Sequence, residues 1–458
     1  MIVEKTSETD RREFLRKISR AAALAASSPV LSTNAGAELS HIWPSVETDS
    51  NQPVHNLRNQ FPLLKERVDG RPLVYLDNAA TTQRPRPVLA AMTDFYAYEN
   101  ANPSKTLHSL ARQSAAKYDR ARDHVARFIN AAGPEEVVFT RGTTEAINLV
   151  ARSWGEANLR AGDEILLTVA EHYSNLVPWQ LAARRAGATL RVLDISDTGH
   201  LRLDQLDKLL SKRTKIVTFP HVSNVLGAIN PAKEICERAH RAGAVALVDA
   251  AQSVPHFPVD VQELGCDFLA FSGHKMCGPM GIGVLCARRE LLEAMPPFQG
   301  GSNMAHEVEI ESVPDFAEGG LKFEAGTPNV PGAVGLAAAI AFLQSLDRKA
   351  LWTREQELTR YALSKLQKIR GSRILGPTKS QERMSVFSFV IENRRPLDVA
   401  TSLDRAGIAV RAGDLASLPL LKRLATEAAV RASCYIYTTK DDIDKLVAGL
   451  EEISGVAN

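Results

Sequence analysis

Short apolar runs alternate with longer amphipathic stretches between residues 74 and 330 of this chain. Runs rich in Val, Ile, Leu and Phe predict strands at residues 137–139, 164–167, 190–193, 215–219, 245–248 and 267–271. Helical stretches separate them, at residues 146–158, 176–185 and 232–242. Where the runs are apolar throughout, the strands are expected to be buried on both faces. The alternation therefore predicts an α/β fold with βαβ units and a mostly parallel sheet.

The pattern changes after residue 330. An apolar helical run over residues 331–346 is interpreted as a connector helix. Beyond it we predict helices at residues 353–369 and 441–453, and strands at residues 386–391, 409–410 and 431–437. The sequence thus predicts a large domain at residues 73–330. The connector and a smaller α+β domain cover residues 331–458, and residues 38–72 form an N-terminal arm.

The first 37 residues differ in composition from the rest of the chain. Arg11 and Arg12 are followed by Phe14, Leu15 and a basic residue, which resembles a twin-arginine export signal. A weakly apolar run follows, and residues 35–37 (AGA) fit a small-residue cleavage site. We therefore expect residues 1–37 to be a signal peptide read by the twin-arginine translocation machinery. The protein is then periplasmic or exported, and cytoplasmic if the leader does not function.

The composition excludes several classes of protein. Of 458 residues, 45% are hydrophobic and 24% are charged, as in ordinary globular proteins. The formal net charge is only +2, and no block rich in Lys and Arg predicts a nucleic-acid site. The leader is too short and too polar to predict a stable membrane anchor. Five scattered cysteines form no CxxC pair and show no spacing suited to zinc, so neither a disulfide scaffold nor a metal site is expected.

Two charged residues stand where apolar strands end. Lys275 follows the strand at residues 267–271, and burial there would lower the pKa of its amine and favour a Schiff base with an aldehyde cofactor. Asp249 ends another apolar strand, and a pyridoxal phosphate ring needs such a carboxylate to keep its ring nitrogen protonated. An exposed loop lysine and a helix-capping aspartate are the alternative interpretations.

Loops after other strands add hydroxyl, imidazole and amide groups. Thr143 and Thr144 open a helix, where hydroxyls and free backbone N–H groups can hold a phosphate, although a plain helix cap is the alternative. His172 can stack on an aromatic cofactor, and Gln252 and Asn224 can reach its ring hydroxyl. Because the carboxyl ends of parallel strands meet at one sheet edge, these groups together predict a site for a phosphorylated, aldehyde-bearing cofactor.

Seven ordered motifs carry a resemblance to a known family. They are residues 75–82 (YLDNAATT), 141–145 (RGTTE), 171–172 (EH), 221–227 (HVSNVLG), 249–252 (DAAQ), 272–275 (SGHK) and 323–329 (FEAGTPN). Over residues 56–455 the chain resembles the class V aminotransferase fold family, and most of all the group II, selenocysteine-lyase-like cysteine desulfurases. The resemblance implies a fold-type I homodimer with a seven-stranded, mostly parallel sheet and bound pyridoxal 5'-phosphate.

The same resemblance implies roles for individual residues. Lys275 and His172 are the expected catalytic residues: Lys275 binds the cofactor covalently and His172 stacks on its ring. Asp249 faces the ring nitrogen, and Arg411 binds the substrate carboxylate beside Asn224. The implied cofactor contacts also include Thr143, Thr144, Asn224, Gln252, Ser272, His274 and, from the other subunit, Thr327.

One segment departs from the family pattern. The desulfurases have an Arg-Thr-Gly-His-His stretch followed by the cysteine that takes up a persulfide, whereas residues 411–416 here read RAGDLA. Ala416 therefore replaces the cysteine, and Asp414 and Leu415 replace the two histidines. The family's N-A-N-x-H-R segment likewise reads NANPSK at residues 100–105. Participation of Cys277, close to Lys275 in the sequence, stays an open alternative.

The family's cofactor-binding residues are kept in this chain, and its substrate-side residues are changed. This combination predicts a pyridoxal-phosphate enzyme that acts on an amino acid or small peptide. The leading hypothesis is a C–S or C–Se lyase acting by β-elimination, because elimination needs no cysteine. Transamination or epimerisation of a free or peptide-borne amino acid, true cysteine desulfuration, and a non-catalytic scaffold are the alternatives. The sequence does not choose among these reaction outcomes.

Overall fold

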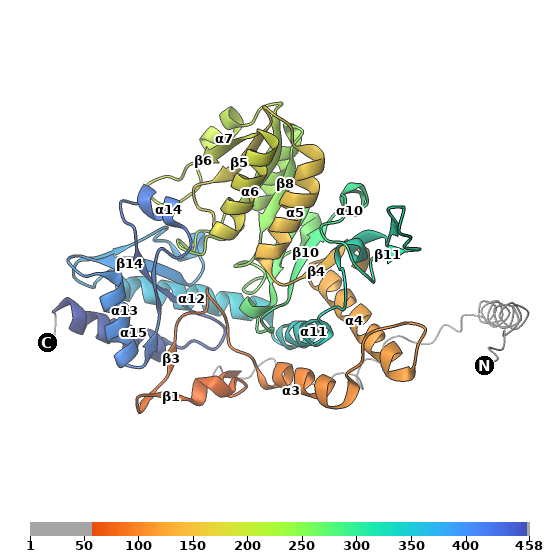
Figure 1. The fold of residues 1–458 in the computed structure, drawn as a ribbon. Coiled ribbons are helices and arrows are strands. Elements are labelled where there is room, and N and C mark those ends of the chain that lie inside the picture. Colours follow the sequence, from red (N-terminus) through yellow and green to blue (C-terminus); the bar gives the residue numbers. More distant parts are fainter. Residues whose placement is uncertain (1–56, 456–458) are drawn as a thin grey trace, which may run out of the picture. The chain divides into compact units, whose positions relative to one another are not determined.

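The computed structural model describes residues 57–455. The predicted signal peptide and residues 38–56 of the predicted arm lie outside this range. Within it, helices pack on a seven-stranded sheet, and the C-terminal part of the chain builds a separate four-stranded sheet with helices of its own (Figure 1).

The large sheet confirms the predicted mostly parallel, seven-stranded α/β architecture. Its strand order is β4 (Val137–Thr140), β10 (Gly283–Ala287), β9 (Phe268–Ser272), β8 (Val245–Asp249), β7 (Thr214–Pro220), β5 (Glu164–Thr168) and β6 (Thr189–Leu193). The strands from β9 to β6 are parallel to their neighbours. Strand β10, for which no separate strand was predicted, runs antiparallel to both β4 and β9.

Apolar side chains on both faces of each central strand place this sheet in the core. Ile165 and Leu167 of β5 belong to one buried cluster that also contains side chains of α5 (Thr143–Asn158) and α6 (Tyr173–Ala186). On α5, buried Ile147, Val150, Ala151 and Trp154 recur at the spacing of one helical face. The two helices therefore cover one side of the sheet and begin at the edge where its parallel strands end.

The helix predicted at residues 331–346 is present as α11 (Val330–Gln344), and α12 (Arg348–Leu366) follows it. Helix α11 is buried along most of its length because α3 (Arg86–Asp94) and α4 (Ser109–Phe128) pack against it. Across residues 57–455 no single helix is long and apolar enough to span a membrane, although α11 and α12 satisfy that test together as a pair bent by 80°.

The smaller sheet is antiparallel, with strand order β13 (Ser372–Ile374), β14 (Val386–Ile391), β17 (Ala429–Ser433) and β16 (Arg411–Gly413). Its apolar face packs on α12, α13 (Pro396–Arg405) and α15 (Lys440–Ser454). Strand β3 (Val74–Tyr75) pairs with β15 (Ile408–Ala409) and contributes Val74 to this core. The chain therefore runs from the C-terminal part of the fold into the segment that begins at Asp77.

The predicted strand at residues 431–437 is too long at its C-terminal end. Strand β17 ends at Ser433, and the Thr438 N–H donates to the Tyr435 carbonyl at 2.9 Å in a turn that replaces further pairing. The remaining helices and strands are β1 (Arg67–Val68), β2 (Arg71–Pro72), α7 (Leu203–Leu209), α8 (Ala232–Arg241), α9 (Val261–Leu264), α10 (Arg289–Ala294), β11 (Ala305–His306), β12 (Asp315–Phe316) and α14 (Leu418–Arg423). Short 3-10 turns and one π-helical turn occupy Pro62–Lys65, Phe95–Glu99, Pro134–Glu136, Gly273–Lys275, Gly319–Phe323 and Ser380–Glu382.

Candidate active site

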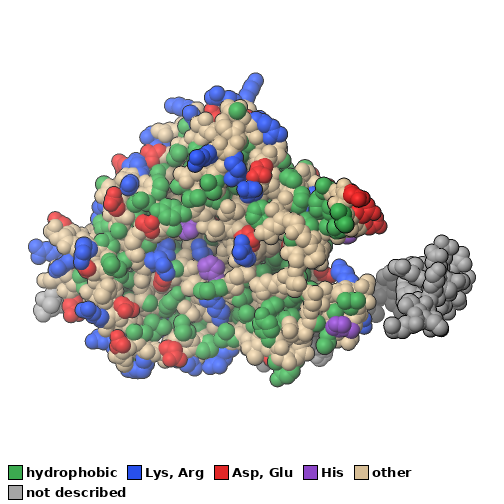
Figure 2. All heavy atoms as spheres, viewed as in Figure 1, with side chains coloured by type: hydrophobic (Ala, Val, Ile, Leu, Met, Phe, Trp, Pro, Cys, Tyr) green, Lys and Arg blue, Asp and Glu red, His purple; other side chains and the backbone are tan. Residues whose placement is uncertain are grey.

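A cavity of about 460 Å³ lies where the parallel strands of the large sheet end. The predicted site residues from the strand-end loops line it together, as the common edge of a parallel sheet requires. They are Thr143, Thr144, His172, Asn224, Asp249, Gln252, Ser272, His274, Lys275 and Arg411. In the space-filling view, histidine and basic side chains reach the surface between the part built from α6 and the part built from β14 and α12 (Figure 2).

Thr327 is the one predicted site residue that the single chain does not bring to this cavity. It lines a separate cavity of about 350 Å³ together with Arg141, Gly281 and Asn329. The family resemblance implies that Thr327 acts from the other subunit of a dimer. Its position in a single chain does not test that role, which stays a prediction.

Hydroxyl groups gather at the first turn of α5. The Thr143 N–H donates to Ser272 Oγ at 2.8 Å, and the two hydroxyls of these residues lie 2.7 Å apart. The Thr144 and Ser174 hydroxyls are also 2.7 Å apart. A Cβ on Gly283 of β10 would lie 2.4 Å from the Gly142 Cα, so glycine is required for β10 to pass this close to the turn. The turn thus presents hydroxyl side chains to the cavity.

Lys275 and Asp249 form the charged centre of the cavity. Burial lowers the pKa of the Lys275 amine to about 8, against the opposing effect of the Asp249 carboxylate. Burial raises the pKa of Asp249, although its Oδ1 accepts a hydrogen bond from the Ala251 N–H at 2.9 Å. A buried carboxylate of this kind is stabilised when a cationic partner faces it. The pair supplies a nucleophilic amine and an anion within one pocket.

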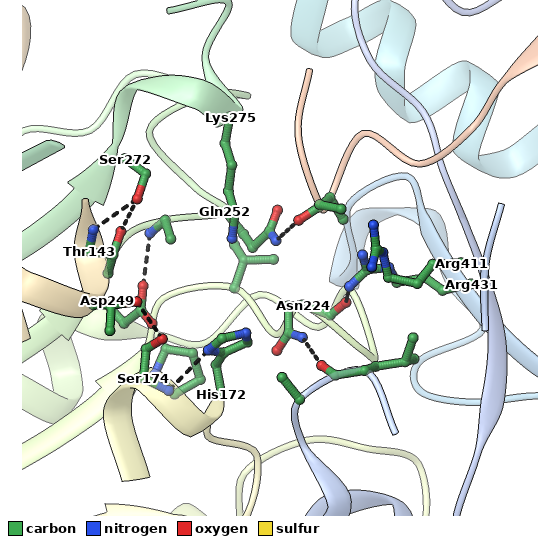
Figure 3. Close-up of a pocket in the computed structure, with 18 of the residues that line it drawn as sticks. Thr143, His172, Ser174, Asn224, Asp249, Gln252, Ser272, Lys275, Arg411 and Arg431 are labelled. Carbon is green, nitrogen blue, oxygen red and sulfur yellow. Dashed lines mark hydrogen bonds between the residues drawn. The ribbon is translucent and has the colours of Figure 1, made fainter. Parts of the chain in front are cut away.

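His172 is held in a neutral form. Its Nδ1 accepts a hydrogen bond from the Ser174 N–H at 3.0 Å, which caps α6 and fixes the ring. Burial, followed by the positive charge of Lys275, lowers the imidazole pKa to about 4. Figure 3 shows His172, Lys275 and Asn224 directed at the same space. A fixed, uncharged ring is suited to stacking on an aromatic cofactor.

The two amide side chains are anchored to the backbone of distant segments. Gln252 Nε2 donates to the Ala79 carbonyl at 2.8 Å, and Asn224 Nδ2 donates to the Leu415 carbonyl at 3.0 Å (Figure 3). Gln252 therefore ties the segment after β3 to the large sheet, and Asn224 ties the loop after β16 to it.

Arg431 is a site residue that the sequence analysis missed. Its side chain is only 3% exposed, lines the cavity, and has a buried Nε without a hydrogen-bond partner among the described residues. Its NH1 donates to the Asn224 carbonyl at 3.0 Å. The available signal was an arginine inside the apolar strand β17, because such a charge is rarely buried without a partner. Burial lowers the pKa of Arg431 to about 10, which leaves it positive at neutral pH.

Arg411 is already engaged by a carboxylate. Its NH2 lies 2.7 Å from Asp77 Oδ2 and its Nε lies 3.1 Å from Asp77 Oδ1, and the side chain is 49% exposed. Asp77 also contacts the Arg431 NH2 at 3.5 Å. The two guanidinium groups are side by side in Figure 3 because Arg411 and Arg431 are partners in the pairing of β16 with β17. Arg431 is the deeper of the two and the less fully paired.

The loop after β16 is tied down over the cavity. Asp414 accepts hydrogen bonds from the Tyr173 hydroxyl at 2.7 Å and from the Ala416 N–H at 3.0 Å. The Tyr173 N–H donates to the Ala416 carbonyl at 2.8 Å. Leu415 and Ala416 have φ angles of 53° and 55°, a conformation that side chains other than glycine rarely adopt. Several hydrogen bonds of the loop therefore hold two residues in an unfavourable backbone conformation.

All five cysteines are buried, and none of them lines the cavity. Cys277 lies behind it, where its N–H donates to Thr82 Oγ1 at 2.9 Å and burial raises the pKa of its thiol to about 12. Burial also raises the pKa of the thiols of Cys236, Cys266, Cys286 and Cys434. A thiolate nucleophile needs the opposite environment, with a lowered pKa and access to the substrate.

The residues present fit pyridoxal phosphate. The Lys275 amine matches its aldehyde and the buried Asp249 matches its ring nitrogen. Thr143 and Ser272 match its phosphate, as does the buried His274 Nδ1, which lacks a hydrogen-bond partner in the described part of the chain. Each of these groups is either costly when buried alone or open to a ligand.

Comparisons with known proteins agree with this geometry. The family model for class-V aminotransferases matches residues 74–446. A probable cysteine desulfurase of Halalkalibacterium halodurans is 50% identical over 398 residues, which cover 87% of this chain and 97% of that protein. A crystal structure of a cysteine desulfurase from Escherichia coli has a TM-score of 0.81 at 38% identity, and the match covers 89% of this chain and all of that one.

A further solved structure is a C-DES mutant with glycine linked covalently to its pyridoxal phosphate cofactor. It has a TM-score of 0.74 at 25% identity, and the match covers 86% of this chain and 98% of that one. The chain therefore belongs to the class-V aminotransferase family and is a pyridoxal-phosphate-dependent enzyme of the cysteine desulfurase-like kind.

Proposed function

We propose that this enzyme eliminates a β-substituent from an amino acid, as a C–S or C–Se lyase, without forming a persulfide on the protein. The observation that carries the proposal is the absence of cysteine from the cavity lining, since every cysteine of the chain is buried elsewhere with a raised thiol pKa. By the family resemblance, Ala416 takes the position of the family's cysteine, and its backbone is bound to Asp414 and Tyr173.

Lys275 is the proposed base. Pyridoxal phosphate, when bound, withdraws electrons from the substrate α-carbon. The Lys275 amine takes the α-proton, for which a pKa of about 8 is well placed near neutral pH. The bond from the β-carbon to sulfur then breaks, and sulfur leaves with the electron pair and gains a proton. Water hydrolyses the released enamine to pyruvate and ammonium, so no oxidant or reductant is consumed.

Arg431 is the proposed receiver of the substrate carboxylate, in place of Arg411. Its buried Nε is free to donate, whereas Asp77 already occupies the fork of Arg411. Guanidinium groups bind carboxylates strongly because two N–H groups can donate in parallel. Arg411 and Asp77 then hold Arg431 in place at the edge of the cavity.

A non-catalytic scaffold is disfavoured by the charged centre. Burying Lys275 and Asp249 costs stability, and a scaffold gains nothing from that cost. Transamination and epimerisation use the same base and the same carboxylate site, so product analysis decides among them.

We predict that attachment of added pyridoxal phosphate to cofactor-free protein accelerates up to about pH 8 and then levels off. Reaction with an aldehyde requires a neutral amine, and burial lowers the pKa of Lys275 to about 8. Stopped-flow absorbance of the bound cofactor measures the rate. A rate that keeps rising far above pH 8 would mean that Lys275 behaves as an ordinary exposed lysine.

We predict pyruvate and ammonia in equal amounts when the cofactor-loaded protein is supplied with cysteine, cystine or selenocysteine. Alanine together with protein-bound sulfur would instead establish desulfuration. Exchange of the amino group with an added oxo acid would establish transamination, and inversion at the α-carbon would establish epimerisation. The Cys277→Ala variant is the control and is expected to keep the product ratio.

Export and dimer formation belong to the same proposal, and they rest on the sequence and the family resemblance. The twin-arginine leader at residues 1–37 directs the chain to the periplasm, and Thr327 of the partner subunit completes the phosphate site. We expect the full chain in the periplasmic fraction and the variant with Arg11 and Arg12 both changed to lysine in the cytoplasm. Equal distribution of the two forms would contradict export through this pathway.

A further inference from the structure

We infer that Asp414 selects the substrate, so that the enzyme prefers an amino acid whose side chain ends in a cation. This inference rests on the proposed function, because it concerns the group that is eliminated. The carboxylate stands two positions before Ala416, in the loop that follows β16, and lines the same cavity as Lys275 and Arg431.

The Asp414 carboxylate is fixed and charged. The Tyr173 hydroxyl holds Oδ2 at 2.7 Å, and the Ala416 N–H holds Oδ1 at 3.0 Å. These hydrogen bonds, that of Tyr173 first, lower the pKa of Asp414 below its ordinary value. The loop is held in turn by Asn224, which donates to the Leu415 carbonyl. The negative charge therefore has one position relative to the cavity.

Each of the other charged side chains of the cavity interacts with a group of opposite charge, whereas Asp414 has no oppositely charged partner in the part of the chain that the structure describes. Lys275 and Asp249 interact with each other, and Arg411 and Arg431 share Asp77. Among the ion pairs of residues 57–455 none includes Asp414, whose two hydrogen-bond partners are neutral. His172 is neutral as well, because its pKa is lowered to about 4. A substrate that places its carboxylate on Arg431 thus meets one uncompensated anion on the same wall.

Both charges come from neighbouring elements of the small sheet. Arg431 lies on β17, and Asp414 directly follows β16, which pairs with β17. An entering amino acid therefore meets a positive group for its carboxylate and a negative group close by. A substrate side chain that ends in an ammonium group is attracted to Asp414, and one that ends in a carboxylate is repelled by it.

Three thioethers of similar size test the inference on the cofactor-loaded full chain. They are S-(2-aminoethyl)cysteine, S-propylcysteine and S-carboxymethylcysteine, which end in a cation, a neutral methyl group and an anion. We expect kcat/KM for pyruvate formation to be about tenfold higher for the cation than for the anion, as one exposed charge supports. The preference is expected to shrink when salt is raised from about 0.05 M to about 1 M.

Variants separate the charge of Asp414 from its place in the loop. Asp414→Asn keeps an oxygen for the Tyr173 hydroxyl and is expected to bring the cation-to-anion ratio close to one, and Asp414→Lys is expected to invert it. Asp404→Asn removes an exposed carboxylate outside the cavity and is the matched control, with the ratio unchanged. A ratio that stays the same in Asp414→Asn overturns the inference.

A binding measurement distinguishes failure of this inference from failure of the proposed elimination. Calorimetric titration of the cofactor-loaded Lys275→Ala variant with the same three thioethers gives dissociation constants while turnover is slowed by about 10²- to 10⁴-fold. A roughly tenfold tighter Kd for the cation than for the anion supports the inference even if no thioether yields pyruvate. Equal Kd values overturn it, even if all three yield pyruvate and elimination stands.

Discussion

Replacing Lys275 with alanine is expected to lower kcat by about 10²- to 10⁴-fold, the usual contribution of a positioned acid–base group. The side chain is partly buried and lines the cavity, and burial lowers the pKa of its amine to about 8, so that it can take a proton near neutral pH. The variant is also expected to lose the absorbance of covalently bound cofactor while its fold is kept. Steady-state kinetics and an absorbance spectrum measure both effects.

Lys208→Ala is the matched control for this prediction, because Lys208 lies exposed on α7, away from the cavity. It is expected to keep both the activity and the spectrum. A small added amine such as methylamine is expected to restore part of the activity of Lys275→Ala, since it can replace the missing base. Full activity in Lys275→Ala would contradict the assignment of the catalytic base.

Replacing Arg431 with glutamine is expected to lower kcat/KM by about 30-fold to several thousandfold, mainly through KM. Truncating one partner of a buried charge pair costs about 2–5 kcal/mol, and Arg431 is a buried guanidinium of the cavity whose Nε has no hydrogen-bond partner within residues 57–455. Arg411→Gln is the comparison variant. Its effect is expected to be much smaller, because Asp77 engages the Arg411 side chain and solvent reaches half of it. A larger loss in Arg411→Gln would restore the assignment made from sequence.

The strand-end residues could be predicted from sequence because their chemistry is local. Lys275 and Asp249 each follow an apolar strand, and parallel strands end at one edge of a sheet, so the topology brings the two together. The same logic places His172 and Thr143 at the cavity, and the structure puts all four there.

The pair of arginines could not be assigned from sequence. Arg411 lies in a motif that resembles the family pattern, whereas Arg431 looks like an irregular position in an apolar strand. Their depths are set by the pairing of β16 with β17 and by Asp77, which comes from the other end of the chain. Such contacts depend on which distant segments come together, and the apolar pattern of one strand does not name its partner strand or the Asp77 segment that meets it.

Strand β10 and the loop after β16 are two further features that depend on contacts between distant segments and could not be predicted from sequence. The short run at β10 gave no strand prediction of its own, and its place between β4 and β9 requires a close approach of Gly283 to Gly142 that the apolar pattern does not reveal. The family resemblance predicts that Asp414 and Ala416 stand where the desulfurases have a histidine and a cysteine. It gave no sign that Tyr173 would bind that loop through both its hydroxyl and its N–H.

The most direct test of elimination without a protein thiol is the intact mass of the enzyme during turnover. The cofactor-loaded full chain is mixed with cysteine at no more than its own concentration, because excess thiol would remove a persulfide from the protein. It is examined by mass spectrometry without added reductant, while pyruvate and alanine are quantified in the same sample. We expect the protein mass to stay unchanged while pyruvate accumulates. A protein mass increased by one sulfur atom, with alanine as the product, would contradict the proposed function.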